Sequence, residues 1–104
     1  MGARSNIAIK YSTGDAVYLY GHWLGEENQK IVEEAIASSS RVDDEAYFTR
    51  VLFCKMLGDN LQDWRGETGY GISPYMVDNE YPIVWVDYTQ RDNMGWPKVY
   101  NEAY

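Results

Sequence analysis

The sequence predicts a small α+β domain in which two helices pack on one face of a small antiparallel sheet. Short segments of alternating β-favouring residues stand towards both ends of the chain, and between them apolar residues recur at helical spacing. The expected order of elements is therefore ββααββ. The chain has 104 residues and shows no repeat or linker, so we place a single domain at residues 1–104.

A hairpin is expected first. Residues 7–11 and 16–20 both alternate in the manner of half-buried strands, and turn-forming residues lie between them. Because side chains repeat every two residues along a strand, Ile7, Ile9 and Tyr11 are expected on the same face.

The first helix is predicted over residues 26–37. Apolar pairs at 31–32 and 35–36 recur at the four-residue spacing of one helical face. Glu26 and Glu27 stand in its first turn, where negative charge complements the helix dipole.

The second helix is predicted over residues 45–57. Asp43 or Asp44 is the expected N-cap, and Gly58 is the expected end, because glycine adopts the left-handed conformation that closes many helices. Its apolar face is wide, so we expect this helix to pack more deeply than the first.

The last part of the chain predicts a second hairpin. Residues 59–69 are polar and are expected to form a loop. Residues 71–77 form a possible strand, which Pro74 would place at an edge or a bulge. After a turn, residues 82–88 have the strongest strand pattern of the chain. Residues 89–104 are expected to form an irregular aromatic tail.

Composition excludes several functional classes. A formal net charge of −7 argues against a protein that binds the phosphate backbone of nucleic acids. No apolar stretch approaches the roughly 20 residues of a membrane span, and the N-terminus lacks the pattern of a signal peptide. The chain has a single cysteine, Cys54, so it forms no internal disulfide. We expect a cytoplasmic protein.

Titratable residues do not predict a reaction. No pairing of a nucleophile with a base is evident, so we assign no catalytic residue, no metal and no cofactor. The single histidine, His22, lies between glycines at the end of a predicted strand, where it either contacts a ligand or caps Glu26 or Glu27 or packs on an aromatic ring. Asp87 is either at the exposed end of its strand or a buried, hydrogen-bonded carboxylate.

One candidate site precedes the first strand. Arg4, Ser5 and Asn6 offer a guanidinium, a hydroxyl and an amide in succession, which suits an anionic or polar group. Together with His22 and Tyr70 they would form a pocket for a small ligand. Alternatively, Ser5 and Asn6 satisfy local backbone groups and Arg4 is solvated.

The aromatic residues suggest a different site. They make up 15% of the chain, with 10 tyrosines and 4 tryptophans. Tyrosine and tryptophan are enriched at surfaces that become buried on association. The residues that we expect to contact a partner are His22, Trp23, Tyr75, Tyr81 and Trp85. The alternative is a core of tyrosines whose hydroxyls point outward.

Four motifs add a family resemblance: GARSNI at residues 2–7, VYLYGHW at 17–23, GYGI at 69–72 and YPIVWVD at 81–87. Together they resemble a family of small bacteriophage accessory proteins that carries no established activity. The resemblance covers most of residues 2–88 and implies no catalytic residue. It implies a protein that acts in the host cell on a host protein or a small molecule.

We therefore expect a non-enzymatic phage accessory protein that binds and modulates a host cytoplasmic protein through an aromatic, acidic surface. The charge favours a basic partner. One alternative is a protein that binds or sequesters a small anionic, nucleotide-like ligand, and a weaker one is an acidic mimic of DNA. A homo-oligomer formed through an open sheet edge is also compatible with the sequence.

Overall fold

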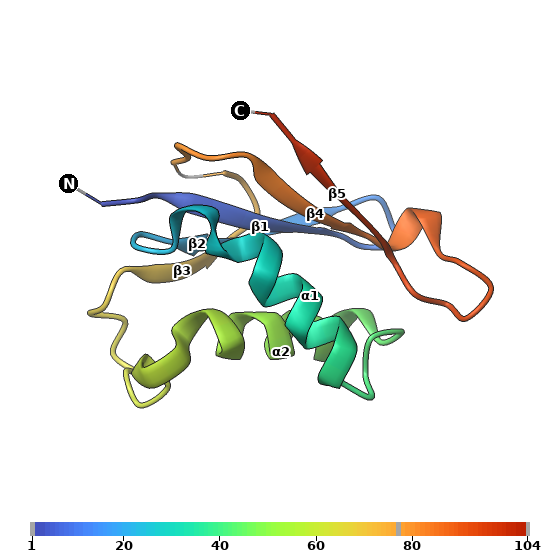
Figure 1. The fold of residues 1–104 in the computed structure, drawn as a ribbon, viewed down its shortest axis with the longest axis horizontal. Coiled ribbons are helices and arrows are strands. Elements are labelled where there is room, and N and C mark those ends of the chain that lie inside the picture. The colour runs from blue at the N-terminus through green and yellow to red at the C-terminus, as the bar shows by residue number, and fades with distance from the viewer. Residues whose placement is uncertain (1, 77, 104) are drawn as a thin grey trace.

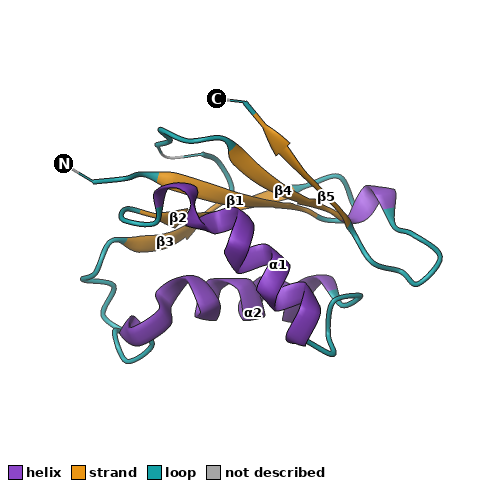
Figure 2. Cartoon of the chain, in the orientation of Figure 1, coloured by secondary structure: helices purple, strands orange, loops and turns teal. Residues whose placement is uncertain are grey.

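The computed structural model describes residues 2–76 and 78–103, which form one five-stranded sheet with two helices below it (Figures 1 and 2). The predicted α+β class is confirmed, and so is the placement of both helices on one face. The elements are β1 Ser5–Lys10, β2 Ala16–Gly21, α1 Asn28–Ser38, α2 Glu45–Leu57, β3 Tyr70–Ser73, β4 Ile83–Asp87 and β5 Lys98–Glu102. Val77 and Tyr104, the last residues of a predicted strand and of the predicted tail, lie outside the described residues.

The first hairpin and both helices follow the sequence pattern closely. β1 and β2 pair antiparallel, with Ile7 opposite Leu19. α1 begins at Asn28, after a single 3₁₀ turn over Gly25–Glu27. Of the two N-cap candidates for α2, Asp44 is the one whose carboxylate accepts a hydrogen bond from the backbone N–H of Tyr47.

The core lies between the sheet and the helices. Ile7 and Ile9 of β1 point towards the helices and are fully buried. They belong to one apolar cluster with residues from β4 and from both helices, such as Val84, Val32 and Leu52. Because side chains alternate along a strand, Asn6 and Ala8 point to the opposite face of the sheet.

The order of strands differs from the expectation. It is β3-β2-β1-β4-β5, so β3 and β4 are not neighbours, and the predicted hairpin between residues 71–77 and 82–88 is wrong. β4 instead pairs with β1 in parallel, with Ile7 opposite Val84. The sheet is therefore mixed, with one parallel pair among antiparallel ones, rather than antiparallel throughout.

Because β4 lies beyond β1 in the sheet, the chain must cross β2 and β1 between β3 and β4. Such a crossover connection is what a parallel pair of strands requires. The chain from β3 to β4 passes over the face of the sheet that the helices leave free (Figure 1). The side chain of Asn6 donates hydrogen bonds to the carbonyl of Asp78 at 2.5 Å and to the side-chain oxygen of Asn79 at 3.0 Å. Asn79 is itself buried and donates to the carbonyl of Tyr81. Local alternation, from which the hairpin was predicted, contains no signal of this long-range contact.

The C-terminal segment is also more ordered than expected. The prediction of an irregular tail over residues 89–104 is wrong, because Lys98–Glu102 forms β5 and pairs antiparallel with β4. Val99 packs against the core, while Tyr100 stacks on Trp85 with ring centroids 6.4 Å apart. This alternation of an inward and an outward side chain favours a strand.

Asp87, which the sequence left open, is a buried and fully partnered carboxylate. It is 1% exposed and accepts hydrogen bonds from Thr89, Gln90 and Tyr100. Burial on its own would raise the pKa of Asp87, but these hydrogen bonds outweigh it and hold the pKa below its ordinary value. Asp87 therefore joins β4 to the 3₁₀ turn Tyr88–Gln90 and to β5.

We predict that Asn6→Ala lowers the free energy of unfolding by about 2–3 kcal/mol, because it leaves a buried acceptor on Asn79 and a part-buried one on Asp78 without their donor. Urea unfolding followed by circular dichroism measures the change. Asn93→Ala, at an exposed position, is the matched control and should leave the stability within about 0.5 kcal/mol of the wild type. Equal stability of the two variants would contradict the anchoring role of Asn6.

We predict that Asp87→Asn changes the pH dependence of stability. A carboxyl with a lowered pKa stabilises the fold above its unfolded pKa of about 4, and this contribution is lost as the pH falls. The variant should be about 1–3 kcal/mol less stable near neutral pH and should lose less stability on acidification. Unfolding midpoints measured at several pH values check this, with the exposed Asp59→Asn as control. Parallel pH curves for wild type and Asp87→Asn would contradict it.

Candidate functional site

Arg4, Ser5 and Asn6 do not come together as a ligand site. The side chain of Ser5 is buried on the helix side, where it accepts a hydrogen bond from Asn28 at 2.9 Å. Asn6 points to the other face and holds the crossover. The Arg4 guanidinium forms ion pairs with Asp78 at 2.6 Å and with Glu80 at 3.1 Å.

The contacts of Arg4 have a clear electrostatic consequence. Hydrogen bonds from the side chain and the backbone N–H of Arg4 hold the pKa of Glu80 below its usual value. In turn, the hydrogen bond to Glu80 and the negative charges of Asp78 and Glu80 raise the pKa of Arg4. The guanidinium is thus engaged by two carboxylates and fastens the crossover to the start of β1, instead of being available for an anionic ligand.

His22 and Trp23 lie at the end of β2, where their rings meet edge to face. The centroids are 4.4 Å apart and the planes are 85° apart. The Nδ1 atom of His22 is hydrogen-bonded to the hydroxyl of Tyr20 at 2.8 Å. The ring of His22 is therefore held in place and supports Trp23, whose side chain is 58% exposed.

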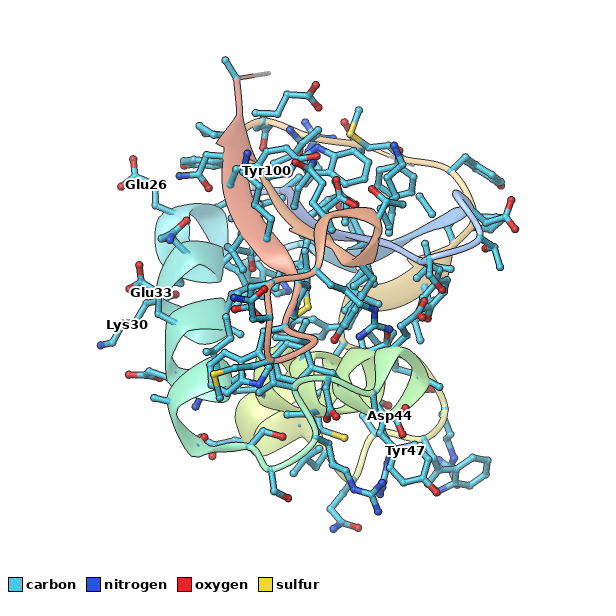
Figure 3. The ribbon with its side chains drawn as sticks, turned by 90° about the vertical axis from the view of Figure 1, so that its right-hand side faces the viewer. Glu26, Lys30, Glu33, Asp44, Tyr47 and Tyr100 are labelled. Carbon is cyan, nitrogen blue, oxygen red and sulfur yellow. The ribbon has the colours of Figure 1, made fainter. Side chains whose placement is uncertain are left out.

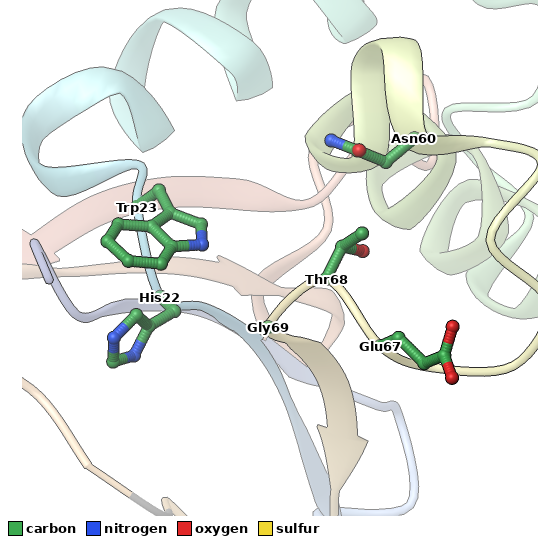
Figure 4. Close-up of a pocket in the computed structure, with 6 residues that line it drawn as sticks. All are labelled: His22, Trp23, Asn60, Glu67, Thr68 and Gly69. Atoms are coloured by element: carbon green, nitrogen blue, oxygen red, sulfur yellow. The ribbon is translucent and has the colours of Figure 1, made fainter.

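A hollow of about 530 Å³ opens beside these rings. Figure 4 shows Trp23 at one side of the hollow and Asn60 at the other, with Thr68 between them. Gly69 lines it as well, in a backbone conformation with φ of +87°. A Cβ atom at this position would lie 3.2 Å from the indole nitrogen of Trp23. Glycine at position 69 therefore allows both the positive φ and the close contact between the loop and the indole.

The loop on the far side of the hollow is shaped by Asp63. Its carboxylate accepts hydrogen bonds from the backbone N–H groups of Glu67 and Thr68 and from the hydroxyl of Thr68. The hydrogen bond from the Thr68 hydroxyl and those from the backbone hold the pKa of Asp63 below its ordinary value. The predicted loop over residues 59–69 therefore has a defined conformation next to β3.

The other predicted aromatic contacts lie in separate places. Trp85 is on the sheet face opposite the helices, between Tyr18 at 5.9 Å and Tyr100 at 6.4 Å, measured between ring centroids. Tyr81 lies near Gly25, which begins the 3₁₀ turn before α1. Tyr70 begins β3 and is half-buried, and burial raises its pKa. Tyr75 follows β3 and is 66% exposed. The expected aromatic residues thus do not form one surface.

The exposed large apolar side chains are concentrated in β3 and the segments next to it. Most of the large hydrophobic side chains that are exposed within the described residues lie on β3 or on the segments next to it. We call this region the β3-edge surface, and its residues are Trp23, Leu61, Trp64, Ile72, Tyr75 and Met76. Sequence reasoning included Trp23 and Tyr75 but missed the others. An exposed tryptophan in the polar loop, Trp64, was the available signal.

The backbone of β3 is open along one side. Antiparallel pairs alternate between hydrogen-bonded and non-hydrogen-bonded residues. The N–H of His22 donates to the carbonyl of Gly69 at 3.0 Å, so these two residues form a hydrogen-bonded pair. Every second pair along β2 and β3 from this point is hydrogen-bonded as well. Gly71 and Ser73 therefore bond to β2, whereas the N–H and C=O groups of Ile72 point outward. The Ile72 side chain is 58% exposed at the same position.

The two edges of the sheet differ in how they are protected. β5, at one edge, carries Lys98 and Glu102 at its ends. β3, at the other edge, has the sequence YGIS and no charged side chain. Charged side chains are a common protection against pairing with a further strand, so β3 is the less protected edge.

The acidic residues are dispersed and many are paired. Glu45 pairs with Arg91 at 2.8 Å, and Glu34 pairs with Lys55 at 3.2 Å. Figure 3 shows Glu26, Lys30 and Glu33 pointing outward on the same side, so a cation stands next to the carboxylates there. Within the described ranges, no three side chains among His, Cys, Asp and Glu are grouped so as to hold a metal ion. None of the helices described is both long enough and apolar enough to cross a membrane.

In comparisons with known proteins, no family model, curated protein or solved structure matches this chain. The resemblance to phage accessory proteins stays a prediction.

We predict that Arg4→Gln loosens the crossover locally, because both ion pairs to Asp78 and Glu80 are lost. Amide hydrogen exchange should become faster at Asp78–Glu80 and stay unchanged in the pair of β2 and β3. Arg65→Gln is the matched control, since Arg65 lies over the Trp64 ring in the distant loop. A uniform change across the sheet would show that Arg4 has no local anchoring role.

Proposed function

We propose that this protein is a non-enzymatic binding protein whose β3 edge takes up an extended segment of a basic protein partner. The observation that carries the proposal is the outward-facing backbone of Ile72 beside its exposed side chain. An added strand would form main-chain hydrogen bonds with Ile72 and cover its side chain.

The exposed side chains around β3 supply the apolar part of this interface. Trp23 lies on one side of the hollow next to the start of β3, and Tyr75 follows the strand. Large aromatic side chains at the centre of an interface commonly contribute most of the binding energy. The hollow beside Trp23 would accept a side chain of the bound segment.

Charge indicates the chemistry of the partner. The chain carries a net charge of −7, and Asp59 and Glu67 are exposed on the loop beside the β3-edge surface. A basic segment would therefore associate faster than a neutral or acidic one. A second copy of this chain would bring the same negative charge and is disfavoured on the same ground. That the partner is a host protein of a phage stays a prediction from the resemblance.

The two alternative functions have less support. A nucleotide-like ligand was expected to use Arg4 and Ser5, but the first is held by carboxylates and the second is buried under α1. An acidic mimic of DNA needs a continuous row of carboxylates, whereas Lys30 points outward on the same side as Glu26 and Glu33 and pairs with Glu34 at 4.0 Å.

The proposal is tested with a short peptide of alternating lysine and valine, titrated into isotope-labelled protein and followed by NMR. A matched peptide of alternating glutamate and valine is the control. We expect the basic peptide to shift the amide signals of Tyr70–Ser73 and the indole signal of Trp23. Shifts confined to β5, no shift at all, or equal shifts with both peptides would overturn the proposal.

We predict that Ile72→Ala weakens binding of the basic peptide about tenfold, because the variant loses most of an apolar contact without a change in charge. The matched control is Met94→Ala, which removes a still more exposed apolar side chain far from β3 in the sequence and should bind as the wild type does. Light scattering completes the test. A dimer that Ile72→Ala dissociates would overturn the proposal, since a second copy would then occupy the edge.

A further inference from the structure

Gly71 lies inside the edge strand β3, at a position where the fold itself does not require a glycine. Its φ is not positive, and no described atom beyond its chain neighbours lies within 4 Å of the place that a Cβ would occupy. The strand pair is regular there, with Tyr20 opposite Gly71 and Leu19 opposite Ile72, so a bulge does not account for the glycine. The other glycines of the chain have a positive φ or would place a Cβ within 3 Å of a neighbouring side chain.

Glycine at this position lowers the stability of the free protein. Glycine loses more backbone freedom on folding than any other residue, and it offers no side chain to pack against its neighbours. Strands favour β-branched and aromatic residues instead. A glycine inside a strand often marks a bulge, a bend or a place where a ligand or another backbone approaches closely. Since the strand pair is regular, Gly71 indicates such a close approach.

The hydrogen-bonding groups of the edge determine which residue of a bound segment lies next to Gly71. Tyr70 and Ile72 direct their N–H and C=O groups outward, because the residues that alternate with them bond to β2. The next outward position is Pro74, which has no N–H to donate. The central residue of an antiparallel segment therefore lies opposite Gly71. The Cα atoms of two residues in such a non-hydrogen-bonded pair are only about 4.5 Å apart.

The side chain of that central residue would point to the face of the sheet opposite the helices. Gly71 belongs to this face, because its neighbour Ile72 is opposite Leu19, which is buried in the core. On β2, the residue opposite Gly71 is Tyr20, whose hydroxyl is hydrogen-bonded to Nδ1 of His22 at 2.8 Å. The bound segment would lie two strand spacings, about 9–10 Å, from β2. Only a long side chain can cross Gly71 and contact the Tyr20 ring.

We propose that the segment bound at β3 carries an aromatic residue at its centre, whose ring lies on the bare backbone of Gly71 and against the ring of Tyr20. The inference rests on the proposed function and adds the residue type that the edge selects. An aromatic residue on a neighbouring strand compensates for a glycine at the edge of a sheet, and contact between two aromatic rings adds to the stabilisation from buried area. The residues on either side of the aromatic one point to the helix face, where an apolar side chain would cover Ile72.

Two peptides test the proposal, Lys-Val-Phe-Val-Lys and Lys-Val-Ala-Val-Lys, both with blocked ends and the same charge. Each is titrated into the full chain and followed by NMR. We expect the Phe peptide to bind about fivefold more tightly than the Ala peptide. The ring current of the Phe peptide should move the Gly71 Hα signals upfield, which the Ala peptide cannot do. Equal affinities, or Gly71 Hα signals that the bound Phe peptide leaves in place, would overturn the proposal.

A variant shows whether Gly71 makes the selection. Gly71→Thr places a β-branched side chain between the incoming ring and the backbone, and we expect the preference for Phe over Ala to fall below about twofold. Asn101→Thr is the matched control, since it places the same side chain at an exposed position of the other edge strand, β5, and should keep the preference. Circular dichroism confirms that both variants fold. A Gly71→Thr variant that keeps the full preference, or that loses both peptides alike, would overturn the assignment.

The same titrations separate this inference from the proposed function. If both peptides shift the amide signals of Tyr70–Ser73 with equal affinity, the edge takes up a strand but does not select an aromatic residue, and only this inference is wrong. If neither peptide shifts these signals, the proposed function is wrong and the inference fails with it.

Discussion

The hydrogen bonds from Asn6 to Asp78 and Asn79 anchor the crossover that leads into β4. They hold the crossover on the face that the helices leave free, and so they allow β4 to pair in parallel with β1. Because β4 is placed beyond β1, β3 has only β2 as a neighbour and becomes an edge. The open backbone of β3 follows from this arrangement.

The polar residues near the N-terminus therefore stabilise the fold. We propose binding instead at exposed apolar residues near β3, most of which the sequence did not indicate as a site. The Arg4 guanidinium and the Asn6 amide are engaged by the crossover. The exposed apolar groups stand at the far edge, where a small four-residue strand leaves Ile72 uncovered. Of the two edge strands, β5 has charged side chains at its ends whereas β3 has none.

Sequence patterns predicted the elements that depend on local chemistry. The first hairpin, an aspartate cap at residue 43 or 44 and the glycine at the end of α2 follow from alternation, capping and backbone freedom within a few residues. The strand order was not predictable in this way, because it depends on contacts between residues more than 70 positions apart. Of the candidate site, the sequence identified Trp23 and Tyr75 from residue type, but the exposure of Ile72 depends on strand order.

Binding at β3 requires that β3 is an edge strand and that the backbone of Ile72 faces outward. Amide hydrogen exchange of the free protein tests this requirement most directly. We expect the Ile72 amide to exchange much faster than those of Gly71 and Ser73, which bond to β2. Protection of Ile72 equal to that of its two neighbours would show that another strand or a second copy covers this edge. That result would contradict both the strand order and the binding surface derived from it.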